Sequence, residues 1–142
     1  ELDAVLSQNY LDHFCKAHLN SEDASFYGNL EVIHNVLSNH FSITPQLMFA
    51  RSKQTAFTEI RQLFFYFSVL FLCKKSPKKF KITYDQVGMF PHVKYGVLPW
   101  KRSIVRYSYE TVMGELDVYA SKRALIYNLT EKIVPALSFK IN

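Results

Sequence analysis

Residues 54–73 read QTAFTEIRQLFFYFSVLFLC, and this stretch predicts the helix around which the rest of the chain packs. From Leu63 to Cys73, every residue except Ser68 is mainly apolar or aromatic. This run is eleven residues long, whereas a membrane-spanning helix needs about twenty apolar residues. A helix that is apolar on every face is typical of the interior of a globular domain. We therefore predict a buried central helix and no membrane association.

Charged residues are unevenly distributed on either side of this helix. Residues 1–50 carry one lysine and six acids, for a net charge of −5, and residues 51–142 carry sixteen Lys and Arg and six acids, for +10. A basic region of this size indicates a polyanionic partner, most often nucleic acid. A surface that merely keeps the protein soluble has the same composition. Charge alone therefore leaves both interpretations open.

The bulk composition predicts a single folded domain over residues 1–142. Of these 142 residues, 49% are hydrophobic and 15% aromatic, which argues against disorder. Two cysteines, Cys15 and Cys73, are too few for a disulfide framework or a zinc site. The chain shows no apolar segment behind basic residues near its start, as a signal peptide would. We expect reduced thiols in a cytoplasmic, monomeric protein.

Apolar residues recur at helical spacing through most of the chain, which predicts an all-α multi-helix bundle. The expected helices cover residues 2–18, about 28–40, 44–49, 54–75, 83–88, 99–116, and 121 to just before Pro135. Residues 1–25 would form an acidic N-terminal helix or arm. Thr44 would cap a helix that has Pro45 at its first position.

Residues 83–116 have the sequence pattern of a helix-turn-helix. Thr83 and Gln86 have capping-box spacing, and Gly88 would end the short helix that they open. Residues 89–99 contain two Pro and one Gly and would form a long loop. Pro99 would then open a helix with basic first turns and a buried stripe at Val105, Tyr109, Val112 and Leu116. The second helix of such a motif presents its N-terminal side chains to the major groove of DNA.

Three stretches together resemble a known family. They are VIHNVLSNHFSITPQLMFARSKQTAFTEIRQLFFYF (residues 32–67), ITYDQVG (residues 82–88) and WKRSIVRYSYETV (residues 100–112). Residues 28–134 are similar to the C-terminal DNA-binding domain of the bacterial replication initiator DnaA, above all to its stand-alone versions in phage and mobile elements. The signature helix departs from the family, because Lys101 replaces its Asp, and Arg102 and Tyr107 replace its two His. No Gly-rich phosphate loop is present, so the ATPase half of an initiator is absent from this sequence.

The resemblance implies a double-stranded DNA-binding domain, from a replication initiator or a regulator of a bacterial or mobile replicon. Arg51 and Lys53 fall in the family's basic loop, which reaches the minor groove. Major-groove phosphates and base edges would be contacted by Lys101, Arg102, Ser103 and Arg106. Nonspecific phosphate contacts would come from Lys74, Lys75, Lys78 and Lys79. Ile104 would touch a thymine methyl group or be buried.

An enzyme is not expected, and neither is a cofactor. The histidines His13, His18, His34, His40 and His92 are not spaced to bind a metal from one helix face. No Ser or Cys has a recognisable catalytic base, so we predict no catalytic residue. The alternative function is a protein-interaction module that keeps the fold without binding DNA. In that case the acidic N-terminal region would dock another protein or fold over the basic face.

Overall fold

A computed structural model describes residues 25–51 and 54–141, and these ranges are helical with no strand. The elements are α2 (Ser25–His40), a 3₁₀ turn (Pro45–Phe49), α3 (Thr55–Ser68), a π-helical extension of α3 (Val69–Lys74), a 3₁₀ turn (Lys78–Phe80), α4 (Tyr84–Tyr95), α5 (Arg102–Val118), α6 (Ala120–Ile133) and a last 3₁₀ turn (Val134–Ala136). The all-α prediction is confirmed. The helix predicted over residues 2–18, with Cys15, lies outside the described residues, as does all of the acidic arm except Ser25.

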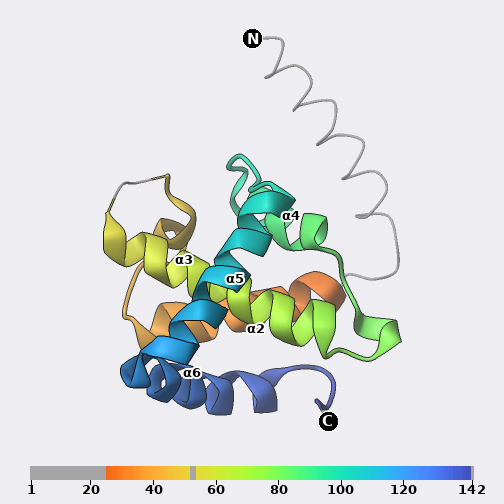
Figure 1. The fold of residues 1–142 in the computed structure, drawn as a ribbon. Coiled ribbons are helices and arrows are strands. Elements are labelled where there is room, and N and C mark those ends of the chain that lie inside the picture. The colour runs from red at the N-terminus through yellow and green to blue at the C-terminus, as the bar shows by residue number, and fades with distance from the viewer. Residues whose placement is uncertain (1–24, 52–53, 142) are drawn as a thin grey trace.

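The centre of the fold is α3 with its π-helical extension, as the sequence predicts. Phe64, Phe65, Phe67 and Leu72 have no exposed surface. Helices α2 and α5 both pack against α3, and α5 crosses it in Figure 1. Because the Phe-rich run is apolar on every face, it can be covered from several sides at once.

The segment Thr55–Lys74, counted as one helix of 20 residues, is long and apolar enough to cross a membrane. However, 61% of its most apolar window is buried against the rest of the protein. The core helix of a globular domain passes the same test of length and composition. Its apolar surface is already covered by neighbouring helices.

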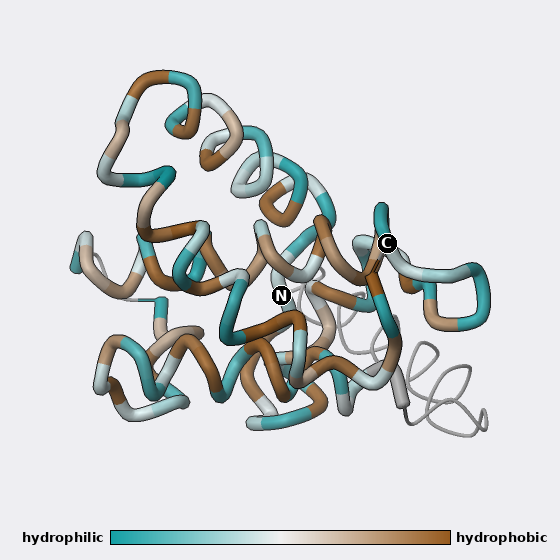
Figure 2. The backbone as a smooth tube through the Cα atoms, turned by 90° about the horizontal axis from the view of Figure 1, so that it is seen from below, coloured by the Kyte–Doolittle hydropathy of each residue, from teal (hydrophilic) through white to brown (hydrophobic). Residues whose placement is uncertain are grey.

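Helix α6 and the C-terminal segment close the bundle over α2. The Asn29 amide nitrogen donates to Ser138 Oγ, and the Ser138 backbone N–H donates to Asn29 Oδ1, both at 2.9 Å. The Phe139 ring stacks on Phe80, with ring centroids 5.1 Å apart. Figure 2 shows hydrophobic positions alternating with hydrophilic ones along the helices. The helices thus pack their apolar residues around the Phe-rich second half of α3 and its π-helical extension.

The prediction for residues 83–99 is half right. The capping box forms, because Thr83 Oγ1 accepts from the Gln86 N–H and the Thr83 N–H donates to the Gln86 side chain. The helix does not end at Gly88 and residues 89–99 are not a loop, because α4 continues through Pro91 to Tyr95. A proline inside a helix costs about 3 kcal/mol, and here Met89, Phe90 and Pro91 are all buried. Their burial outweighs the lost backbone hydrogen bond, and Gly96, with φ of 72°, ends the helix.

Three helix starts differ from the predictions. Helix α2 begins at Ser25, three residues before the predicted Gly28. Helix α5 begins at Arg102 and not at Pro99, because residues 98–101 remain outside the helix. Helix α6 begins at Ala120, so Ser121 lies inside the helix and does not cap it. Thr44 does precede the helical turn at Pro45, but that turn is 3₁₀ and the Thr44 side chain makes no capping bond.

Candidate nucleic-acid interface

Helix α5, the predicted recognition helix, is largely exposed. Only Val105, Ser108 and Val112 of its residues are buried. From the predicted stripe, Tyr109 and Leu116 are half-buried and pack against the core. Ile104 is 39% exposed, so the buried role considered for it is wrong. Ten of the 17 residues of α5 are exposed, so a broad side of this helix is accessible to a partner.

Gly88 of α4 is in close backbone contact with Trp100, which lies just before α5. The Trp100 backbone N–H donates to the Gly88 carbonyl at 3.0 Å. A Cβ atom at position 88 would lie 2.0 Å from the Trp100 carbonyl oxygen, which no real side chain tolerates. Glycine is therefore required where the segment after α4 passes back over it. This contact holds α4 against the residues that lead into α5.

Two arginine guanidinium groups lie over the Trp100 ring. The Arg51 guanidinium carbon lies 4.0 Å from the ring centroid, and that of Arg61 lies 4.2 Å from it. Arg51 Nη2 also donates to the carbonyls of Leu98 and Pro99, at 3.2 and 2.9 Å. Arg61 Nη1 donates to the Ala50 carbonyl at 3.2 Å. Arg51 is thus tied to the turn that precedes α5.

Arg61 was not among the residues that the sequence predicted for the site. It is 9% exposed although it carries a charge. Burial lowers the pKa of its guanidinium, and the neighbouring positive charge of Arg51 lowers that pKa further. The sequence does contain a signal for Arg61, which is an arginine at the edge of an apolar run. Charged residues are rarely buried unless a partner stabilises them, so such an arginine is a candidate for a specific role.

The two arginines predicted to read the major groove are both in ion pairs. Arg102 makes a two-pronged contact with Asp85 of α4, with nitrogen–oxygen distances of 3.2 and 2.7 Å. Arg106 pairs with Glu110 one turn later in α5, at 3.0 Å. Their side chains remain 73% and 70% exposed. Lys101 and Ser103 are exposed beside them.

The predicted lysine cluster, which consists of Lys74, Lys75, Lys78 and Lys79, lies at the other end of α3 from Arg51. All four lysines are exposed, and none pairs with a carboxylate of the described residues. Lys74 lies over the Tyr109 ring, 5.2 Å from its centroid, and so reaches α5. The predicted residues therefore form two groups, one around the start of α5 and one at the far end of α3, where Lys74 reaches Tyr109 of α5. Lys53 lies outside the described residues.

The remaining titratable groups of the core indicate packing rather than chemistry. His34 is fully buried, with Nε2 2.6 Å from the Tyr95 hydroxyl and Nδ1 3.3 Å from Met48 Sδ. Burial is the main cause that lowers its pKa to about 4. Burial likewise raises the pKa of the half-buried Cys73 thiol to about 12, which keeps the thiol unreactive. The described residues contain no group of three His, Cys, Asp or Glu side chains that could hold a metal ion.

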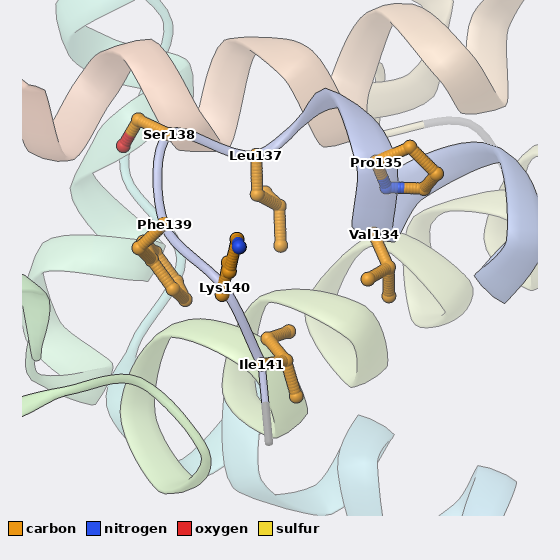
Figure 3. Close-up of a pocket in the computed structure, with 7 residues that line it drawn as sticks. All are labelled: Val134, Pro135, Leu137, Ser138, Phe139, Lys140 and Ile141. Carbon is orange, nitrogen blue, oxygen red and sulfur yellow. The ribbon is translucent and has the colours of Figure 1, made fainter.

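A hollow of about 490 Å³ lies beside the C-terminal segment (Figure 3). Its lining comes from Val134, Pro135, Leu137, Ser138, Phe139, Lys140 and Ile141. Lys140 is the one ionisable residue among these lining residues, and the Ser138 hydroxyl accepts a hydrogen bond from Asn29. This lining lacks the converging polar groups of a ligand site. The interface on α5 remains the better candidate.

Comparisons with known proteins found no match to this chain. No protein-family model, no curated protein and no solved structure matches the chain.

Proposed function

We propose that this chain binds double-stranded DNA and places α5 in the major groove. The observation that carries this proposal is the position of α5, an exposed helix with cations at two points along it. Arg51 and Arg61 lie on Trp100 just before its first residue, and Lys74 lies on Tyr109 two turns further on. A helix in the major groove meets a phosphate backbone on either side.

The cations at these two points have no carboxylate partner in the part of the chain that the structure describes. Arg51 and Lys74 are exposed, so they are available to replace the counterions of DNA, which is the main source of affinity for a duplex. The net charge of +10 over residues 51–142 supports the same partner.

The ion pairs of Arg102 and Arg106 do not oppose this function. Exposed pairs contribute only about 0–1 kcal/mol to stability. Arg102 can therefore exchange Asp85 for a phosphate or a guanine edge at small cost, and its planar fork suits both. Asp85 would keep the side chain extended beside the groove until DNA arrives.

The resemblance to the initiator domain supports a narrower version of the proposal. The protein would act at a replication origin or as a regulator in a bacterial or mobile replicon, in the cytoplasm. This version depends on the three sequence stretches that carry the resemblance.

Fluorescence anisotropy with a labelled duplex at two salt concentrations tests DNA binding directly. We expect binding at low salt and a steep loss of affinity as salt increases, because each neutralised phosphate releases counterions. The absence of duplex binding at low salt would contradict the proposal.

Variants then separate the roles of individual cations. Arg102→Ala should weaken binding to a preferred duplex by about 1–3 kcal/mol and relax the preference at one base pair. Lys78→Ala should weaken binding to all duplexes alike and reduce the salt slope by about one. Arg123→Ala on α6 is a matched control, because Arg123 is an exposed arginine that belongs to neither cation group and bonds to the Leu116 carbonyl. Equal losses in all three variants would argue against a specific role for α5.

A protein-interaction module is the second candidate function. Apolar side chains are exposed on α5, with Tyr107 61% exposed and Val118 69% exposed, and Ile104 lies on the same face. With Arg102 and Arg106 paired to their own carboxylates, α5 is less basic than the sequence suggests. Tyr107→Ala would distinguish the two functions if it abolished capture of a partner protein and left duplex binding intact.

A further inference from the structure

The two arginines at Trp100 have no carboxylate partner among the described residues, and they contact the same ring. Arg102 and Arg106 each pair with a carboxylate. Arg51 and Arg61 bond only to backbone carbonyls and share one indole ring. A stacking contact with an indole stabilises each cation, but it does not neutralise two like charges held side by side.

Hydrogen-bond donors also exceed acceptors at this point. A guanidinium has five N–H donors, and the bonds to described residues use one nitrogen of Arg51 and one of Arg61. The Trp100 Nε1 donor is buried and has no partner among the described residues. Water reaches the free donors of the exposed Arg51, but those of the buried Arg61 and of Trp100 Nε1 are largely shielded from it. Buried polar groups are nearly always satisfied, so these buried donors beside two positive charges indicate a missing acceptor that carries negative charge.

We propose that Arg51, Arg61 and Trp100 form an oxyanion site for a phosphate group. Guanidinium groups bind phosphate through two parallel N–H···O bonds, which is the geometry that a tetrahedral oxyanion offers. Arg51 is exposed, so an anion can reach it, whereas Arg61 is 91% buried and would add its charge in a less polar environment. The site stands on this geometry alone, and only the identification of its phosphate as a DNA phosphodiester rests on the proposed function.

The site also couples the anion to α5. The Arg51 bonds to Leu98 and Pro99 and the Trp100 bond to Gly88 hold the segment from which α5 starts. A phosphate bound here would fix the position of the first turn of α5 relative to the duplex. The anion would therefore act as a reference point for the helix rather than as a source of sequence preference.

Trp100 makes the site directly observable, because it is the one tryptophan of the chain. We would follow Trp100 emission while inorganic phosphate replaces chloride at constant ionic strength. The expected result is a saturable change in emission. In Arg51→Gln we expect the phosphate affinity to fall by at least about tenfold, the loss of one charge-assisted contact. Arg123→Gln is the matched control, since it removes an exposed arginine that also bonds to a backbone carbonyl, and its titration should equal that of the wild type.

Arg61 is tested with the conservative variant Arg61→Lys, because a neutral residue at this buried position can prevent folding. Lysine keeps the charge and loses the fork, so we expect a several-fold weaker phosphate affinity with an unchanged circular dichroism spectrum. Emission that responds to chloride and phosphate alike, or that saturates equally in Arg51→Gln, would overturn the site.

A short duplex then identifies the source of the phosphate. If the site takes a DNA phosphodiester, duplex binding changes Trp100 emission, and Arg51→Gln lowers affinity for all sequences and the salt slope by about one. A phosphate response without duplex binding would support a site for a free phosphate compound and defeat the DNA proposal. Duplex binding that neither changes Trp100 emission nor weakens in Arg51→Gln would defeat the site and leave the DNA proposal standing.

Discussion

Helices α3 and α5 cross each other in the middle of the molecule, yet they have opposite surroundings. From Leu63 to Val69, every residue of α3 and its extension is buried. Helix α5 buries three of its 17 residues. Both helices carry aromatic residues, and one pair, Tyr66 and Tyr109, stacks between them at 5.5 Å. Helix α3 therefore forms the core, whereas α5 packs against α3 through one side and exposes the other.

This difference separates stability from function in the molecule. Substitutions in α3 remove apolar contacts that neighbouring helices cannot replace. Substitutions on the outer side of α5 change groups that are already in water, and these usually alter stability by less than about 0.5 kcal/mol. Residues that determine binding are therefore expected on α5 and at the ends of α3, where charge reaches the surface.

The largest expected effect comes from Phe64→Ala. Phe64 has no exposed surface and contacts the rings of His34, Phe49 and Phe90. We expect the free energy of unfolding to fall by about 3–5 kcal/mol, measured by urea denaturation. Tyr107→Ala on α5 is the control and should cost less than about 1 kcal/mol. Similar losses in both variants would contradict the contrast between the helices.

Acid should weaken the packing on the α3 side through His34. The pKa of His34 is lowered to about 4 in the folded protein, mainly by burial and then by Lys94, while Glu31 raises it. As the pH falls, the unfolded state therefore binds a proton on His34 before the folded state does. The contribution of neutral His34 to stability is fully present above about pH 6.5 and is lost as the pH falls to about 4. The loss attributable to His34 between pH 7 and pH 4 should be about 2–3 kcal/mol.

The measurement for His34 is a pH series of denaturant unfolding in the wild type and in His34→Gln. The variant should be less stable at pH 7 but should lose less stability on acidification. Parallel pH curves for the two proteins would show that another group causes the acid sensitivity.

Two glycines should respond in opposite directions to alanine. Gly88→Ala would force the Trp100 carbonyl away from α4, at a cost of about 1–3 kcal/mol. Gly114 in α5 has no atom within 4 Å of an added Cβ, so Gly114→Ala should increase helix stability by about 0.5–1 kcal/mol. Thermal unfolding measures both changes. A stabilised Gly88→Ala variant would refute the close approach that positions α5.

The smallest expected change in stability is that of Arg102→Ala. The Arg102 side chain is 73% exposed, so loss of its pair with Asp85 should change the free energy of unfolding by less than about 1 kcal/mol. Its predicted effect on duplex affinity is larger than this. A variant that unfolds easily and also fails to bind DNA would assign Arg102 to the fold rather than to the interface.

The sequence was sufficient to predict elements whose signal is local. The all-α class, the buried central helix and the capping box of Thr83 and Gln86 all follow from residue type and spacing. The Pro and Gly residues at positions 91–99 led to the wrong prediction of a loop. The penalty of about 3 kcal/mol for Pro91 describes the helix backbone alone and takes no account of packing against other helices. Burial of Met89 and Phe90 against other helices offsets it, and such contacts cannot be read from spacing.

The candidate site divides in the same way. Residue type alone placed Arg102, Arg106 and the lysine cluster at the surface, and the exposed positions agree. Only the tertiary structure decided that Arg102 pairs with Asp85 and that Arg51 and Arg61 meet on Trp100. These partners are 17, 49 and 39 positions apart in the sequence. Helical periodicity relates residues three or four positions apart, whereas contacts at this range depend on how whole helices pack.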